Sequence, residues 1–228
     1  MSIAENLKTV KDRIASAAKR AERDPSSVRL IVVTKTVDVE SIRQAVAAGA
    51  SVLGENRVQE AREKIEKLGS IARWHLIGHL QTNKAKYAVK LFELIHSVDN
   101  LELAKELDKQ AVKTGKVQNV LIEVNIAGES AKAGIAIQEV TALVRNAAKL
   151  KNISIKGLMT MPPYSEDPED SRPYFRKLQE MAETIKKENI PAVTMNELSM
   201  GMSGDYEVAI EEGATMVRVG TAIFGNRN

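Results

Sequence analysis

Apolar residues recur at helical spacing along the first twenty residues. They stand three or four positions apart, at Ile3, Leu7, Val10, Ile14, Ala17 and Ala21. This spacing predicts a helix with one apolar face, which ends before Pro25. Ser2 and Glu5, three positions apart at its start, predict a capping box.

Beyond this helix, short apolar runs alternate with longer amphipathic stretches. The apolar runs predict eight strands, at residues 29–34, 50–53, 74–78, 94–98, 119–124, 153–159, 193–198 and 216–219. The stretches between them predict helices at residues 38–48, 55–68, 82–90, 100–114, 136–150, 171–188 and 205–212. Four of these helices are followed by glycines suited to a left-handed cap, at Gly49, Gly69, Gly115 and Gly213.

The alternation of strand and helix predicts a parallel sheet of the α/β class. Runs such as 31–33 and 120–122 are apolar on both faces, as strands covered on both sides are. An open sheet and a closed barrel both satisfy this pattern. Eight strands favour the barrel, and no glycine fingerprint follows the first strand. We therefore predict a (β/α)8 TIM barrel with an extra N-terminal helix, one domain over residues 1–228, and a long exposed loop at 162–170.

Composition narrows the functional classes. The 33 Lys and Arg residues against 30 Asp and Glu leave a net charge of +3, and the charges are interleaved, so we predict no nucleic-acid partner. The absence of cysteine excludes disulfides and thiolate chemistry. No apolar run approaches the ~20 residues of a membrane helix, and no secretory signal is evident. We expect a cytoplasmic protein that does not bind membranes.

Lys35 is the first candidate for chemistry. It follows the first strand, and the period of two places it on the same face as Ile31 and Val33. In a barrel that position points to the mouth, where partial desolvation favours a neutral, nucleophilic amine. A neutral amine beside an aldehyde forms an imine. The alternative is a lysine that merely extends its charge into solvent, and Lys35 alone does not exclude it.

Small residues follow the last two strands. The loops after strands seven and eight of barrels frequently bind phosphate through backbone N–H groups. Because Asp205 and Glu207 would repel an anion, we place the phosphate near Ser199–Gly201 and Gly220–Thr221. The alternative for the first loop is an ordinary helix start with Ser203 as its N-cap. Arg218 is suited to meet either a phosphate or a ring nitrogen.

The two histidines His75 and His79 stand four positions apart, but they straddle a strand and its turn. Four residues do not share a side there as they would on a helix, and no third ligand lies nearby in sequence. We therefore predict no metal site.

Several longer strings occur in a fixed order along nearly the whole chain. They are Val33–Lys35, Gly54–Glu60, Trp74–Lys84, His96–Asp99, Gly157–Met161, Glu197–Ser203 and Arg218–Thr221. In these strings the chain resembles the YggS/PROSC family of pyridoxal phosphate homeostasis proteins. The resemblance implies a fold-type III barrel, similar to that of alanine racemase. In it Lys35 holds pyridoxal 5′-phosphate (PLP), the vitamin B6 cofactor, as a Schiff base, the internal aldimine.

The resemblance also implies the surroundings of the cofactor. Ser199, Gly220 and Thr221 would lie around the phosphate, and Asn56 and Arg218 close to the cofactor. An arginine that faces the pyridine nitrogen, as in similar racemases, keeps it unprotonated and weakens PLP as an electron sink.

A carrier follows from these expectations, with no catalytic residues. It would capture PLP reversibly, limit the free aldehyde and pass PLP to apo-enzymes, and we expect it to be monomeric. Racemases with this fold carry a second β domain, for which 228 residues leave no room. Three alternatives stay open: a stand-alone racemase or decarboxylase, a Schiff-base aldolase on a sugar phosphate, and a partner-binding module that uses the acidic loop 164–170.

Overall fold

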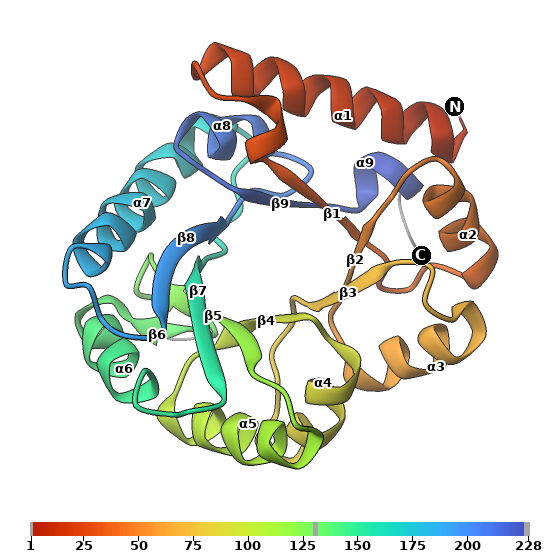
Figure 1. Cartoon of the computed structure of the whole chain (residues 1–228). Coiled ribbons are helices and arrows are strands. Elements are labelled where there is room, and N and C mark those ends of the chain that lie inside the picture. Colours follow the sequence, from red (N-terminus) through yellow and green to blue (C-terminus); the bar gives the residue numbers. More distant parts are fainter. Residues whose placement is uncertain (1, 130–131, 226–228) are drawn as a thin grey trace.

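The computed structural model of the chain describes residues 2–129 and 132–225, and within them parallel strands form a closed ring (Figure 1). The eight strands of the ring are β1 (Arg29–Val33), β2 (Val52–Glu55), β3 (Arg73–Leu76), β4 (Leu94–Val98), β5 (Gln118–Asn125), β7 (Ile153–Met159), β8 (Val193–Ser199) and β9 (Met216–Val219). The ring closes where β9 pairs with β1. A two-residue strand, β6 (Ile135–Ala136), pairs with the end of β5. The predicted (β/α)8 barrel is confirmed.

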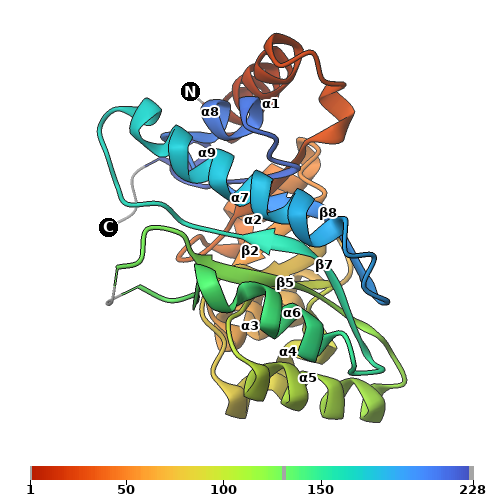
Figure 2. The same cartoon turned by 90° about the vertical axis from the view of Figure 1, so that its left-hand side faces the viewer.

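Helices surround the strands on the outside of the ring (Figure 2). They are α1 (Ile3–Arg20), α2 (Val39–Ala47), α3 (Val58–Leu68), α4 (Ala85–Leu91), α5 (Leu101–Thr114), α6 (Val140–Ala147), α7 (Arg172–Lys186), α8 (Tyr206–Glu211) and α9 (Thr221–Phe224). The short 3-10 turns η1 (Pro25–Ser27), η2 (Thr82–Lys84), η3 (Ile137–Glu139) and η4 (Pro168–Ser171) join some of them to the strands. None of the helices in the described residues is long and apolar enough to cross a lipid bilayer.

The extra helix α1 forms as its apolar spacing predicts. Leu7, Val10, Ile14 and Ala17 are buried, and Ser2 and Glu5 make the expected capping box. The helix packs against α8 and α9, so it covers the side of the barrel where the chain closes on itself.

Several elements differ from the sequence predictions. The helix predicted at residues 136–150 is confined to α6, after β6 and η3. Helix α3, which was predicted to begin at residue 55, begins at Val58. Gly54 and Glu55 stay in β2, where they pair with His75 and Leu76 of β3. The helix α9 was not predicted, since four residues are too few for a periodic pattern.

Two apolar cores flank the strand layer. The one inside the barrel is small and consists of Ile31, Val33, Val52, Ile77, Leu94, Leu121, Met159 and Met216. The larger one fills the space between strands and helices. Because the inner apolar core contains few residues, the rest of the interior is open to polar side chains.

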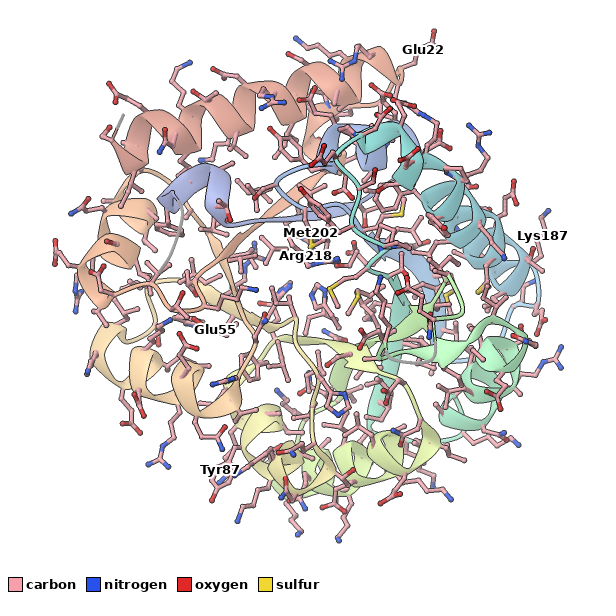
Figure 3. The ribbon with its side chains drawn as sticks, turned by 180° about the vertical axis from the view of Figure 1, so that it is seen from behind. Glu22, Glu55, Tyr87, Lys187, Met202 and Arg218 are labelled. Atoms are coloured by element: carbon pink, nitrogen blue, oxygen red, sulfur yellow. The ribbon has the colours of Figure 1, made fainter. Side chains whose placement is uncertain are left out.

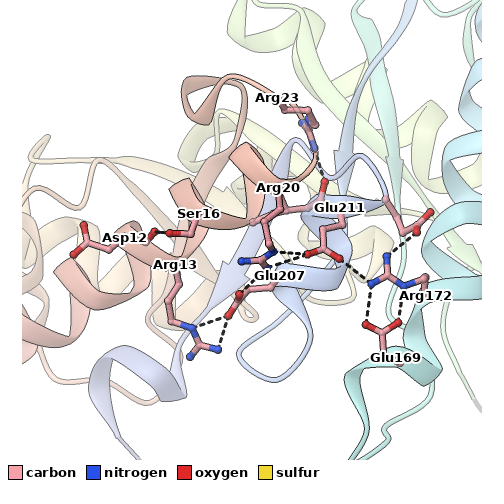
Figure 4. Close-up of polar contacts among 11 residues, drawn as sticks. Asp12, Arg13, Ser16, Arg20, Arg23, Glu169, Arg172, Glu207 and Glu211 are labelled. Carbon is pink, nitrogen blue, oxygen red and sulfur yellow. Dashed lines mark hydrogen bonds and ion pairs between the residues drawn. The ribbon is translucent and has the colours of Figure 1, made fainter.

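Ion pairs hold α8 from both sides (Figure 4). Arg20 of α1 bonds Glu207 and Glu211 at 3.0 and 2.9 Å. Arg172 of α7 bonds Glu211 and Glu212, each at 2.8 Å. Helix α8 is therefore tied to α1 and α7, and the loop that precedes it forms one wall of the site described next.

Candidate functional site

A cavity of about 410 Å³ opens at the end of the barrel where the strands terminate. Lys35, Asn56, Arg218, Gly220 and Thr221, all predicted site residues, line it. A larger cavity of about 730 Å³ lies at the opposite end, against α1 and the starts of the strands. Barrels carry their binding and catalytic groups at the carboxyl ends of the strands, so we take the smaller cavity as the candidate site.

Lys35 reaches the cavity from the end of β1, beyond the inward-facing Val33. The sequence prediction placed it on this side, and that placement is confirmed. The predicted desolvation is wrong: the side chain of Lys35 is exposed.

Arg218 lies inside the barrel, near its centre (Figure 3), and only 4% of the residue is exposed. Its guanidinium donates to Ser199 Oγ at 2.6 Å and to the carbonyl oxygen of Thr160 at 2.9 Å. Burial lowers the pKa of Arg218 to about 10, against the opposing effect of Glu123 and Asp205. The side chain therefore brings a fixed positive charge to the cavity at neutral pH.

A chain of buried polar groups continues behind Arg218. Ser199 Oγ lies 2.9 Å from His96 Nδ1, and His96 Nε2 lies 3.0 Å from His75 Nδ1. Burial lowers the pKa of His75 to about 3 and that of His96 well below its ordinary value. Both imidazoles are therefore neutral near pH 7, and their hydrogen bonds fix Ser199 and, through it, Arg218.

Ser199 and Gly201 are not among the described residues that line the cavity. Ser199 instead accepts a hydrogen bond from Arg218, which does line the cavity. Gly201 turns the chain at φ +88°, where a Cβ would lie 2.6 Å from Ala209 Cβ and 2.9 Å from Tyr206 Cα. The predicted contact of these two residues with a ligand stays a prediction.

The small-residue loops after β8 and β9 meet at the cavity. Ser203 Oγ accepts long hydrogen bonds, 3.4 Å each, from the N–H groups of Gly220 and Ala222. Among residues 2–129 and 132–225, no hydrogen bond engages the N–H of Gly204 or Thr221. These N–H groups can therefore donate hydrogen bonds to an anion in the cavity.

Asp205, and not Ser203, is the N-cap of α8, which corrects the alternative considered from the sequence. Its carboxylate accepts from the N–H of Met202 at 2.7 Å and from Ser171 Oγ at 3.1 Å. These two hydrogen bonds engage both carboxylate oxygens, but Asp205 keeps its negative charge and lines the cavity.

The loop at 162–170 was predicted only to be exposed. Tyr164 is 90% exposed, yet Pro163, Tyr164 and Ser165 all line the cavity. His79 also lines the cavity, and its Nδ1 lies 3.8 Å from a carboxylate oxygen of Asp99. The spacing of the loop residues in the sequence does not predict that they line the cavity.

Glu123 is a buried acid that the sequence analysis missed. It is 3% exposed, and its Oε2 has no hydrogen-bond partner among the described residues. Burial, and secondly the charge of Asp99, raise its pKa to about 7. Its place in β5, two residues after the inward-facing Leu121, is the signal that would have found it.

No three His, Cys, Asp or Glu side chains of the described residues are placed to hold a metal ion. His75, on its strand, is bound to His96 inside the barrel, as a hydrogen-bonded strand residue.

Comparisons with known proteins match the whole chain. The family described as "Alanine racemase, N-terminal domain" matches residues 5–228. The pyridoxal phosphate homeostasis protein of Aquifex aeolicus is 48% identical over 228 residues, which cover 100% of this chain and 99% of that protein. This chain belongs to the family of pyridoxal phosphate homeostasis proteins. The Escherichia coli member of this family is 39% identical over 234 residues, with 99% of this chain and 97% of that protein covered.

Solved structures of a homeostasis-family member and of alanine racemases are both similar to this chain. PipY of Synechococcus elongatus, solved with PLP bound, has a TM-score of 0.86 at 37% identity and covers 98% of this chain and 100% of its own. Alanine racemase of Clostridium difficile has a TM-score of 0.72 at 18% identity, with 98% of this chain and 57% of that chain covered. Homeostasis proteins and racemases therefore share the barrel fold.

Proposed function

We propose that this protein binds PLP in the cavity at the mouth of the barrel and holds it on Lys35 for reversible release. One observation carries the proposal. The Lys35 amine, the buried Arg218 cation and the two small-residue loops face a single cavity of about 410 Å³. The PLP-bound structure of PipY, a relative over its full length, supports the choice of ligand.

The donor set of the cavity fits the chemistry of PLP. A cavity of about 410 Å³ lies within the range of about 300–1,000 Å³ that is usual for small-molecule sites. The N–H groups of Gly204 and Thr221 and the hydroxyl of Thr221 suit a phosphate. When bound, PLP supplies an aldehyde carbon that an amine attacks.

Each residue then has a defined task. Lys35 condenses its amine with the aldehyde and releases water, and the reverse reaction frees the ligand. The loops after β8 and β9 hold the phosphate end. Asn56, which follows β2, also lines the cavity. Arg218, fixed by Ser199 and Thr160, supplies a cation to either the phosphate or the ring nitrogen.

A carrier is supported by the relatives, which are named homeostasis proteins. An arginine beside the ring nitrogen weakens carbanion chemistry, although similar racemases have one as well. The pKa of Arg218 stays near 10 in spite of burial, so an arginine that faces the ring nitrogen leaves that nitrogen unprotonated. PLP is then a weak electron sink, and carbanion chemistry at an amino acid is disfavoured. Delivery to apo-enzymes, a monomeric state and a cytoplasmic location belong to the same proposal.

Removing the lysine tests the attachment. Wild type, Lys35→Ala and the control Lys105→Ala, which changes an exposed lysine of α5, are mixed with PLP and passed through gel filtration. We expect wild type and the control to keep a visible absorbance band and Lys35→Ala to lose it. Borohydride reduction and peptide mapping should place the adduct on the peptide that contains Lys35. An adduct on another lysine, or a wild type that stays colourless, would overturn the assignment.

Exchange of the Cα hydrogen of amino acids with solvent tests whether the protein is a carrier and not an enzyme. The PLP-loaded protein is incubated with amino acids in heavy water, and deuterium at Cα is followed by NMR. We expect exchange no faster than with the same concentration of free PLP. Faster exchange would reject the carrier in favour of a racemase or decarboxylase.

A further inference from the structure

A buried ion cluster lies behind the strand end that carries Lys35. The side chain of Lys64, on α3, is only 9% exposed, and its amine bonds Glu55 Oε1 at 2.7 Å and Glu60 Oε1 at 2.6 Å. Glu55, at the end of β2, lies between the ring and the outer helices, away from the central Arg218 (Figure 3). Lys64, Glu55 and Glu60 are not among the described residues that line the cavity.

This cluster binds the backbone on both sides of Lys35. Before it, the carbonyl oxygen of Thr34 accepts from the Lys64 amine at 2.6 Å, and Thr34 Oγ1 donates to Glu55 Oε1 at 2.7 Å. After it, the N–H of Thr36 donates to Glu60 Oε1 at 2.6 Å. Both neighbours of Lys35 in the chain are thus held by charged side chains.

The backbone at Thr36 needs such support. Its φ is +58°, in the left-handed region that β-branched residues rarely adopt. A residue held there persists only where its surroundings impose the conformation, and such sites cluster where function demands a fixed geometry. The bond from the Thr36 N–H to a carboxylate is charge-assisted and therefore among the stronger kinds of hydrogen bond.

The cluster is also expensive to bury. Glu55 is fully buried, and its Oε2 has no hydrogen-bond partner among the described residues. An apolar pair of similar size at such a place would often be no less stable. Because this cluster lies next to Lys35 but outside the cavity, we expect its role to be to fix the backbone conformation beside Lys35.

We propose that Glu60 and Lys64 are positioning residues for Lys35. They fix the backbone before and after it, and the turn so formed aims the amine into the cavity. The inference rests on the proposed attachment of PLP to Lys35. Fixing the turn restricts the space in which the amine moves, and orientation of this kind raises the rate at which two groups combine.

Variants at Glu60 test the proposal, because this side chain is partly exposed and its loss should leave the fold intact. Glu60→Ala removes the acceptor of the Thr36 N–H, whereas Glu60→Gln keeps an oxygen there. Glu66→Ala is the control: Glu66 lies on the same helix in an exposed ion pair with Arg62. The measurements are the rate constant of PLP capture by stopped-flow absorbance, amide exchange at Thr36 by NMR, and thermal unfolding.

We expect Glu60→Ala to speed exchange of the Thr36 amide and to slow capture about tenfold. Glu60→Gln should recover most of the capture rate, and Glu66→Ala should match wild type. Lys64→Met, if it folds, should slow capture as well.

Two results would overturn the proposal. One is faster exchange at Thr36 in Glu60→Ala with capture at the wild-type rate. The other is an equal loss of capture in Glu60→Ala and Glu60→Gln that only follows their thermal stability. A wild type that captures no PLP on Lys35 is a different failure, that of the proposed function, and mapping of the wild-type adduct identifies it.

Discussion

At the scale of single residues, polar side chains inside the barrel determine the site as much as those on the cavity wall. Arg218 is held by a serine hydroxyl that is itself bound to a histidine. Ser199 thus joins a cation to a neutral ring, and both partners are buried. The hydroxyl serves two partners at once, so its loss affects both.

We expect Ser199→Ala to lower the free energy of unfolding by about 1–3 kcal/mol, because it removes the hydroxyl that Arg218 Nη1 and His96 Nδ1 share and leaves these two buried atoms without that partner. Urea unfolding measures the change. Ser16→Ala, which removes an exposed hydroxyl on α1, serves as the control and should change stability by at most about 0.5 kcal/mol. A Ser199→Ala protein as stable as wild type would show that the buried chain contributes nothing to stability.

At the scale of elements, the close approach of two strands affects stability more than the surface ion pairs do. The pairs that hold α8 are partly exposed, and each such pair typically contributes about 0–1 kcal/mol. The contact of β7 with β8 allows much less change. A Cβ at Gly157 would lie 1.7 Å from the carbonyl oxygen of Glu197, so the two strands pair at this point only because position 157 has no side chain.

Gly157→Ala should therefore destabilise the protein by about 3 kcal/mol or more, or prevent folding, because the overlap is with backbone and no side chain can move aside. The measurement is thermal unfolding together with the yield of folded protein. Gly204→Ala is the matched control, since a Cβ there meets nothing within 4 Å. A folded Gly157→Ala protein with wild-type stability would mean that β7 and β8 can separate at little cost.

At the scale of the whole molecule, the buried groups make stability depend on pH in two opposing ways. The pKa of His75 is lowered to about 3, so its contribution is present above pH 6.5 and is lost as the pH falls toward 3. The pKa of Glu123 is raised from 4.5 to about 7, so its contribution is present below pH 4.5 and is lost as the pH rises through 7. Between these limits the two effects partly cancel.

We expect Glu123→Gln to remove the second effect. The shift of Glu123 from 4.5 to about 7 corresponds to a cost on the order of 3 kcal/mol for the charged form at pH 8. The variant should therefore be more stable than wild type at pH 8 and no more stable at pH 4. Urea unfolding at both values measures this, and a gain of equal size at pH 4 would contradict the assignment to Glu123.

The sequence predicted the eight strands of the ring and placed Lys35 at its mouth, because these depend on periodicity and on order along the chain. It did not predict which polar residues meet inside the barrel. His75 and His96 lie on the neighbouring strands β3 and β4, but Ser199 lies on β8, and only the closed ring brings it to His96.

Local chemistry therefore determined the elements, their order and the positions of Lys35 and of the two small-residue loops. The tertiary structure alone decided that Lys35 is exposed, that Ser199 supports Arg218, and that Tyr164 faces the cavity. The physical reason is that alternation and helical spacing fix the direction of a side chain relative to its own element. Its burial and its partners depend on distances between elements, which only the packed barrel sets.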